Sequence, residues 1–190
     1  MGGILSTKIN RKPLKNTTKM AQKITDPATF LRNLVVRKGT SDRLGVYLTS
    51  VNVVADAQTE YDYEVKPENV KLELRMLTKG TYEQAWNSFV VNALEEEEEI
   101  VHSLTFPYLG ESVTLFLLTE GNELSCSVFL PKAEVSEFPF DVVFFQALLK
   151  KLAKLTSKYA TNIRFHVGLA TIAWDDMVEQ GHAQEVEIPQ

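Results

Sequence analysis

The stretch SVTLFLLTEGNELSCSVFLP, residues 112–131, decides the fold class because it predicts a β-hairpin. Two runs rich in Val, Leu, Phe and Thr flank the turn sequence TEGNE, and Gly and Asn favour such turns. Downstream, residues 140–160 predict a long amphipathic helix, whose apolar stripe would be Phe144, Leu148, Leu152, Leu155 and Tyr159. Residues 163–174, IRFHVGLATIAW, then predict a final strand.

The sequence before the hairpin predicts further helices and strands. Asp26 and Pro27 are typical of a helix start, and residues 67–80, PENVKLELRMLTKG, predict a short helix between Pro67 and Gly80. Three more stretches predict strands: VYLTSVNVVA (46–55), YDYEVK (61–66) and SFVVNAL (88–94). Strands interleaved with three or so helices indicate an α+β domain of residues 24–180.

Charge separates the start of the chain from its body. The 190 residues carry a net charge of −5, yet residues 1–19 hold five basic residues and no acid, so the rest sums to −10. The acidic body argues against non-specific nucleic-acid binding by the body itself. We therefore predict a basic extended arm over residues 1–23, which could contact nucleic acid or a membrane, and a polar tail over residues 181–190.

Other features of the sequence are informative mainly by exclusion. One Cys rules out an internal disulfide, and no signal peptide or membrane-span pattern is present. Gly2 followed by Ser6 fits the N-myristoylation pattern, although a plain basic tail explains the same residues. The Glu95–Glu99 run is typical of a solvated surface, and His102 and His166 have no partners at metal spacing. We predict no metal and no cofactor.

Several stretches, in order, resemble thymidylate synthase and its relatives, the deoxynucleotide hydroxymethylases. These are GTSDRLG (39–45), ELRMLTKG (73–80), ELSC (123–126), FPFD (138–141) and HVGLATIAWDDMVEQ (166–180). The resemblance spans residues 29–180 and ends before the family's C-terminal segment that closes over folate. It implies a mixed sheet packed against a long helix and two or more shorter helices, and a homodimer built sheet against sheet.

The resemblance implies that Cys126, the lone cysteine, is not the family's nucleophile. That nucleophile lies upstream, in a Pro-Cys-His motif before the first hairpin strand, and here the region reads FPYLGESVT. The matching position is Tyr108 or Glu111, and neither supplies the soft thiolate that attacks C6 of the pyrimidine. Cys126 matches the family's second cysteine, so we expect a small buried side chain.

Four residues remain as candidate remnants of the family's site. Arg43 matches a phosphate-contacting arginine, Lys132 neighbours the position of another, and Glu73 matches the glutamate that organises water. Asp141 stands where synthases have Asn and where the hydroxymethylases acting on dCMP have Asp, which can accept from the cytosine amino group. Each also has a structural interpretation: Arg43 as a loop anchor, Glu73 as a surface or capping residue, and Asp141 as the N-cap of the long helix.

The other family positions have changed. The paired arginines that the family supplies across its dimer fall near Asn87 and Ser88, and the arginine of its Gln-Arg-Ser motif falls at Pro131. The His and Tyr that hold the sugar hydroxyl become Thr171 and Ala173.

Three functions follow as hypotheses. The first is a catalytically inactive relative that serves as a structural or interaction component of a homo-oligomer. We expect it in the host cytoplasm or a virion, because the compact, degenerate form suggests a phage or viral protein. The second is an active pyrimidine deoxynucleotide C5 methyl- or hydroxymethyltransferase. The third is a nucleotide or nucleic-acid binding module that uses Arg43, Lys132 and the basic arm.

Overall fold

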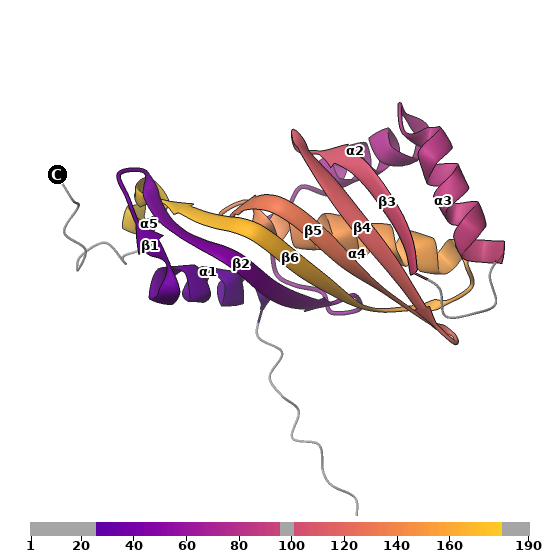
Figure 1. Cartoon of the computed structure of the whole chain (residues 1–190), viewed down its shortest axis with the longest axis horizontal. Coiled ribbons are helices and arrows are strands. Elements are labelled where there is room, and N and C mark those ends of the chain that lie inside the picture. The colour runs from indigo at the N-terminus through magenta and orange to yellow at the C-terminus, as the bar shows by residue number, and fades with distance from the viewer. Residues whose placement is uncertain (1–25, 96–100, 180–190) are drawn as a thin grey trace, which may run out of the picture.

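The computed structural model of the protein describes residues 26–95 and 101–179. The predicted arm of residues 1–23, most of the Glu95–Glu99 run and the predicted tail of residues 181–190 lie outside these ranges. The described residues form a six-stranded mixed sheet and five helices (Figure 1). The predicted α+β class is confirmed.

The last strand in the sequence lies in the middle of the sheet. Its strands are β1 (Thr40–Ser41), β2 (Gly45–Asp56), β3 (Val101–Tyr108), β4 (Glu111–Glu120), β5 (Glu123–Glu134) and β6 (Tyr159–Ala173). The spatial order is β1-β2-β6-β5-β4-β3. Only β5 and β6 pair in parallel, joined by a long crossover, and the other neighbours are antiparallel. One edge is formed by the very short β1 and, past it, by residues 48–56 of β2, and the other edge is the strand β3.

Four of the helices cover one face of this sheet. The helices are α1 (Pro27–Lys38), α2 (Pro67–Lys79), α3 (Glu83–Glu95), α4 (Phe138–Leu155) and α5 (Trp174–Glu179). In Figure 1, α4 runs behind the central strands, α1 lies below β2, and α2 and α3 lie beside β3. The short α5 follows β6 at one end of the sheet. The result is a two-layer arrangement with one open sheet face.

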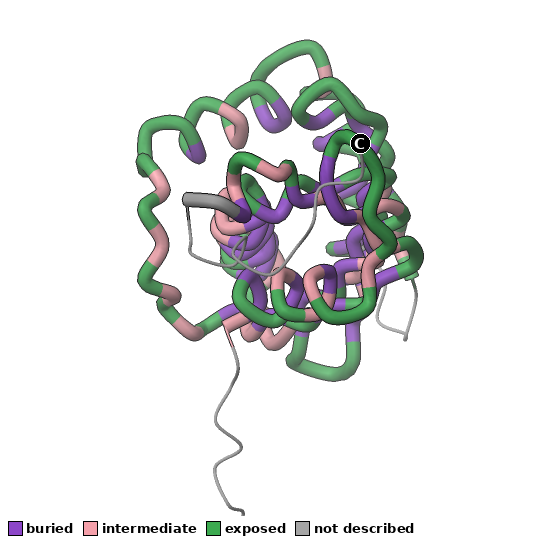
Figure 2. The backbone as a smooth tube through the Cα atoms, turned by 90° about the vertical axis from the view of Figure 1, so that its left-hand side faces the viewer, coloured by how far each residue is buried: buried purple, intermediate pink, exposed green. Residues whose placement is uncertain are grey.

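The core lies between α4 and the strands. Alternate residues of β6 are buried on the helix side, among them Ile163, Phe165 and Val167, because side chains alternate along a strand. From α4, Phe138 and Phe145 are fully buried, and both rings meet Phe165 edge-on, with centroids 5.2 and 5.8 Å away. Figure 2 shows the buried positions gathered in the interior of the molecule. Each such side chain stabilises the fold by about 1.5–3 kcal/mol relative to exposure.

The predicted hairpin and two predicted helices are confirmed. Strands β4 and β5 pair from Thr114–Phe129 to Glu120–Glu123 around a turn at Gly121, whose φ of 56° suits glycine. Asp26 caps α1, since its Oδ1 accepts from the amide of Ala28 at 3.0 Å. Helix α2 begins at Pro67 and ends before Gly80, as predicted.

Two predicted strands are wrong. Residues 88–94 belong to α3 and not to a strand, because Phe89 and Ala93 are buried at helical spacing. Residues 61–66 form no strand; the hydroxyl of Tyr61 accepts from the amide of Asp56 at 3.0 Å, which holds this segment as a loop.

The long helix is shorter than predicted. Helix α4 ends at Leu155, which is exposed, and Tyr159 already starts β6. At this end of the helix, the side-chain hydroxyl of Thr156 donates a hydrogen bond to the carbonyl of Leu152 at 2.9 Å. The predicted stripe therefore holds for Phe144, Leu148 and Leu152 but not for the last two members.

The pairing between neighbouring strands is interrupted along one row in the middle of the sheet. Ser50 of β2, Gly168 of β6 and Pro131 of β5 lie opposite one another, and none of them forms a bridge pair there. Ser50 has a left-handed φ of 56°, and a Cβ on Gly168 would lie 2.7 Å from the carbonyl oxygen of Pro131. The central strands thus approach too closely at this row for any residue larger than glycine in β6.

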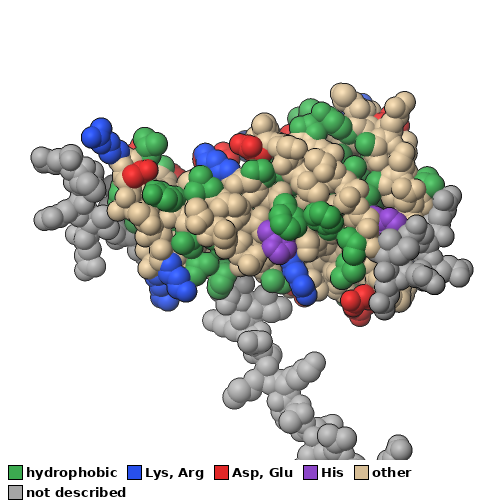
Figure 3. Space-filling model, in the orientation of Figure 1, with side chains coloured by type: hydrophobic (Ala, Val, Ile, Leu, Met, Phe, Trp, Pro, Cys, Tyr) green, Lys and Arg blue, Asp and Glu red, His purple; other side chains and the backbone are tan. Residues whose placement is uncertain are grey.

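The open sheet face carries an aromatic cluster. The ring of Phe129 stacks on His166 with centroids 4.5 Å apart and meets Phe116 edge-on at 5.5 Å. The Nδ1 atom of His166 lies 2.7 Å from Oδ1 of Asn52, and Val54 on the same strand face is exposed. Figure 3 views this face and shows hydrophobic side chains gathered around a histidine. We call Asn52, Val54, Phe116, Phe129 and His166 the open-face cluster.

Candidate functional site

The two candidate nucleophile positions flank a tight turn. Tyr108 ends β3 and Glu111 begins β4, and the two residues are paired across the turn formed by Leu109 and Gly110. Both turn residues have positive φ, 48° and 84°, as two-residue hairpin turns of this kind require. Tyr108 is buried at 4% exposure, whereas Glu111 is exposed.

Asp141 is buried beside Tyr108. The Tyr108 hydroxyl donates to Oδ1 of Asp141 at 2.8 Å, and Asp141 is only 5% exposed. Asp141 lies in the first turn of α4 and does not cap it: the helix begins at Phe138, with Glu137 in the N-cap position. The predicted N-cap role is therefore wrong. The helix starts earlier because Pro139 suits its first turn.

Burial dominates the acid–base behaviour of this pair. Desolvation raises the pKa of Asp141 to about 7, and the nearby carboxylate of Glu137 also raises it, whereas the hydroxyl of Tyr108 opposes them. The pKa of Tyr108 rises well above its usual value, chiefly through burial and then through the charge of Asp141. Around neutral pH, Asp141 therefore exchanges a proton while Tyr108 keeps its own.

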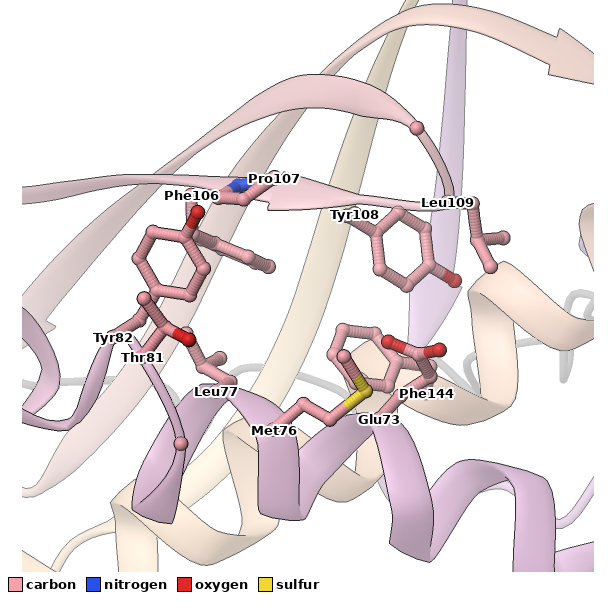
Figure 4. A pocket seen from close by; sticks show the side chains of 12 residues that line it. Glu73, Met76, Leu77, Thr81, Tyr82, Phe106, Pro107, Tyr108, Leu109 and Phe144 are labelled. Atoms are coloured by element: carbon pink, nitrogen blue, oxygen red, sulfur yellow. The ribbon is translucent and has the colours of Figure 1, made fainter.

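Five predicted site residues line cavities that meet at the β3–β4 turn. Glu73 and Tyr108 line a cavity of about 480 Å³ beneath the turn, shown in Figure 4. Glu111, Lys132 and Asp141 line a neighbouring cavity of about 140 Å³, which Tyr108 also borders. We call these two adjoining cavities the central cleft. The structure thus brings together residues that lie far apart in the sequence.

Aromatic side chains line the larger cavity, and the sequence did not reveal this. Phe106, Phe144 and Tyr82 line it, and Tyr108 stacks on Phe144 with ring centroids 4.7 Å apart. In Figure 4 the carboxylate of Glu73, on α2, points up toward the side of the cavity that holds Tyr108. The spacing of Phe144 within the apolar stripe of α4 predicts burial, but it gives no sign that the ring borders a cavity.

Lys132 is compensated by a neighbouring acid. Its Nζ donates to Oε1 of Glu134 at 2.9 Å, and this contact raises the pKa of Lys132. Both side chains are nearly half exposed, so the pair contributes little stability. It nevertheless offsets the positive charge that a phosphate would need in this part of the cleft.

Arg43 lies on the loop between β1 and β2 and does not line the central cleft. Its neighbours Asp42 and Leu44 border a separate cavity of about 500 Å³, which extends to Lys132. Asp42 shapes the loop because its Oδ1 accepts from the amides of Leu44 at 2.8 Å and Gly45 at 3.2 Å. Arg43 itself is exposed at the bend.

The remaining family positions are scattered. Asn87 and Ser88 are exposed on α3, where Ser88 borders a cavity with β3. Thr171 and Ala173 near the end of β6 border the cavity beside the Arg43 loop. Among the described residues, no three His, Cys, Asp or Glu side chains gather as a metal site.

Cys126 is a core residue. It is 2% exposed and lies on the helix side of β5 together with Leu124 and Val128, as the alternation along the strand predicted. Burial raises the pKa of its thiol well above the ordinary value, so the thiol stays neutral. Cys126 lines none of the cavities that form the central cleft. The expectation of a small buried side chain is confirmed.

Comparison with protein families and with curated proteins gives no match for this chain. Across residues 26–95 and 101–179, no helix is both long and apolar enough to cross a membrane.

Proposed function

We propose that this chain is a catalytically inactive, thymidylate-synthase-like protein that acts as a structural or interaction component of a homo-oligomer. The observation that carries the proposal is the chemistry of the central cleft. Tyr108 and Glu111 stand at the nucleophile position that the resemblance implies, and the one thiol of the chain, Cys126, is buried in the core. A covalent mechanism at pyrimidine C6 needs an accessible thiolate.

The charges around the cleft support the loss of nucleotide binding. Glu111, Glu134 and Glu137 border the smaller cavity, and Lys132 is ion-paired to Glu134. Carboxylates so placed repel a nucleotide phosphate, and Arg43 does not line the cleft to offset them. This arrangement favours the inactive protein over the nucleotide-binding alternative.

The open sheet face supports the homo-oligomer. Its aromatic cluster is centred on β5 and β6, and its exposed members Phe129 and Val54 are apolar. Exposed apolar patches rimmed by polar groups mark interaction surfaces in soluble proteins. A second copy related by a two-fold axis would cover this surface with the same surface of its own.

The alternative of an active C5-transferase has two residues in its favour. Glu73 and Asp141 both border the central cleft, where a general acid–base and a base-recognising carboxylate would be needed. Neither can replace the attacking group, because enolate formation at C5 depends on the covalent adduct. The two functions therefore differ in one measurable step.

Release of tritium from the C5 position tests the proposal. We expect none above a buffer blank when the protein is incubated with C5-tritiated dUMP or dCMP and methylene-tetrahydrofolate. A matched sample carrying Glu111→Ala and another carrying Tyr108→Phe serve as controls. Turnover by the native chain that either substitution abolishes would overturn the inactive assignment and identify the substitute nucleophile.

A further inference from the structure

A groove beside α2 has apolar walls and an acidic rim. A cavity of about 980 Å³ runs along this helix, and it shares Glu73 and Leu109 with the 480 Å³ cavity of the central cleft. Two apolar side chains of the same helix are exposed beside these cavities: Leu72, which borders the larger one, is 57% exposed, and Met76, which borders the 480 Å³ one, is 55% exposed. We call the surface formed by Glu64, Leu72, Glu73, Met76, Leu109 and Glu137 the acidic groove.

The negative charge of this groove favours a positively charged occupant. Glu64, Glu73 and Glu137 border its larger cavity, against one opposing amine, that of Lys66. The carboxylate of Glu73 also lies close enough to Tyr108 to raise the pKa of that phenol. Because the walls are apolar and the rim is anionic, a segment with alternating apolar and basic side chains suits it better than a small anion.

The first 19 residues of the chain have that composition. Residues 1–19 carry five Lys and Arg side chains and no acid, with Ile and Leu interspersed among them. The remainder of the chain carries −10, so the segment and the body are of opposite charge. The apolar members of the segment match the exposed Leu72 and Met76 of the groove.

The point where this segment joins the fold lies next to the groove. Asp26 accepts a hydrogen bond from the hydroxyl of Tyr63, which ties the start of α1 to the loop before α2. The carbonyl of Tyr63 accepts from the amide of Val65 at 2.8 Å, and Val65 borders the groove. From Asp26 back to Lys19 an extended chain spans about 25 Å, which makes the groove accessible within one molecule.

We propose that residues 1–19 dock in the acidic groove of their own chain. Their lysines and arginine lie beside Glu73 and Glu137, and their apolar side chains cover Leu72 and Met76. This docking does not depend on the proposed homo-oligomer and would hold equally in a monomer.

Paramagnetic relaxation in the full-length protein tests the docking. A nitroxide is attached at Lys12→Cys, while the buried native Cys126 stays unlabelled. We expect the label to broaden the amide signals of Glu73 and Leu109 but not that of Gly121, at the β4–β5 turn. Raising NaCl to about 1 M, where the screening length falls to roughly 3 Å, should remove the broadening.

A matched pair of variants locates the binding surface. Glu73→Gln with Glu137→Gln should abolish the broadening, whereas Glu120→Gln with Glu123→Gln, exposed residues at the β4–β5 turn, should retain it. Unchanged thermal melting of both pairs shows that the fold is intact. Absence of broadening at low salt, or broadening that survives loss of the groove carboxylates, overturns the proposal.

Mixing isotope-labelled chains without nitroxide with unlabelled chains that carry it distinguishes docking within a chain from docking between chains. Docking in cis predicts no broadening in this mixture. Broadening of Glu73 and Leu109 in the mixture would place the segment on a neighbouring copy, and that result overturns the intrachain assignment.

Discussion

At the scale of single residues, Asp141 is the group most altered by folding. An unfolded Asp titrates near pH 4, whereas burial raises the pKa of Asp141 to about 7 in the folded protein. The folded state therefore holds a proton that the unfolded state has released between these two values. A proton bound preferentially by the folded state makes folding less favourable as the pH rises.

This linkage predicts a pH-dependent effect of Asp141→Asn. The stabilising contribution of the protonated acid is fully present below pH 4 and is lost as the pH rises through 7, amounting to at most about 4 kcal/mol. Asparagine can still accept from the Tyr108 hydroxyl and carries no charge. We therefore expect urea unfolding between pH 5 and 8 to show a steeper loss of free energy for the native chain than for the variant.

Parallel pH profiles for the two proteins would mean that Asp141 is ionised in the folded state throughout this range. Tyr108→Phe provides the control, because it removes the hydroxyl that favours the ionised carboxylate. That variant should retain the pH dependence and shift its midpoint upward.

Cys126 gives a second prediction at this scale. Its burial predicts slow reaction with thiol reagents in the native protein and fast reaction after denaturation. Cys126→Ala should cost about 1 kcal/mol of unfolding free energy, because only a small side chain leaves the core. Rapid stoichiometric labelling of the native protein would contradict this assignment.

At the scale of helices and strands, the sequence is most reliable where the hydrophobic periodicity agrees with the Pro and Gly residues that mark the ends of an element. The hairpin around Gly121 and the helix between Pro67 and Gly80 had both signals and were predicted correctly. Residues 88–94 were misread because a short apolar run fits a strand and a buried helix alike. Residues 61–66 alternate like a strand, but the hydroxyl of Tyr61 accepts from the nearby amide of Asp56, and that of Tyr63 donates to the distant Asp26.

The candidate site was predictable only in part. The resemblance named Tyr108, Glu111 and Asp141, and these residues do lie around one cleft. The hydrogen bond between Tyr108 and Asp141 depends on how β3 meets the start of α4, a tertiary contact that no local period records. For the same reason the acid Glu137, which raises the pKa of Asp141, had no distinguishing signal.

The interrupted row across the sheet predicts a large effect for a small substitution. Gly168→Ala places a Cβ 2.7 Å from the carbonyl oxygen of Pro131, and a backbone atom cannot turn aside as a side chain can. We expect a loss of about 1–3 kcal/mol of unfolding free energy, measured by chemical denaturation. Ser103→Ala, on an exposed site of β3, should change stability by no more than about 0.5 kcal/mol. Equal effects of the two substitutions would show that the central strands can separate at this row.

At the scale of the whole molecule, the two sides of the sheet differ in what covers them. The helix side holds the core and the central cleft, and the open side exposes the aromatic cluster around Phe129. Because the two sides are separate, residue changes in the central cleft need not alter the surface of the open face. The proposed inactive homo-oligomer rests on this separation between the cleft and the association surface.

Substitution of Phe129 tests this separation. Phe129→Asp should shift the protein from a dimer or larger species to a 21.4 kDa monomer in sedimentation at about 10 μM, because a charge would be buried unpaired in the interface. Leu155→Asp, at a residue of nearly equal exposure at the end of α4, should leave the dimer intact. Native protein that sediments only as a monomer, or a control that dissociates equally, would contradict the open-face interface.

The ends of the sheet limit how such molecules can assemble. Unpaired strand edges let identical chains add side by side into fibres, and both edges here resist this. The strand β1 is only two residues long, and Pro107 in β3 lacks the amide hydrogen that an incoming strand would need. Past β1, residues 48–56 of β2 have no strand partner on that side among the described residues, but Ser50, with its left-handed φ of 56°, interrupts this stretch. These features disfavour growth along the sheet from either edge. A pair joined through the faces would therefore be a closed object, which can be concentrated without polymerising.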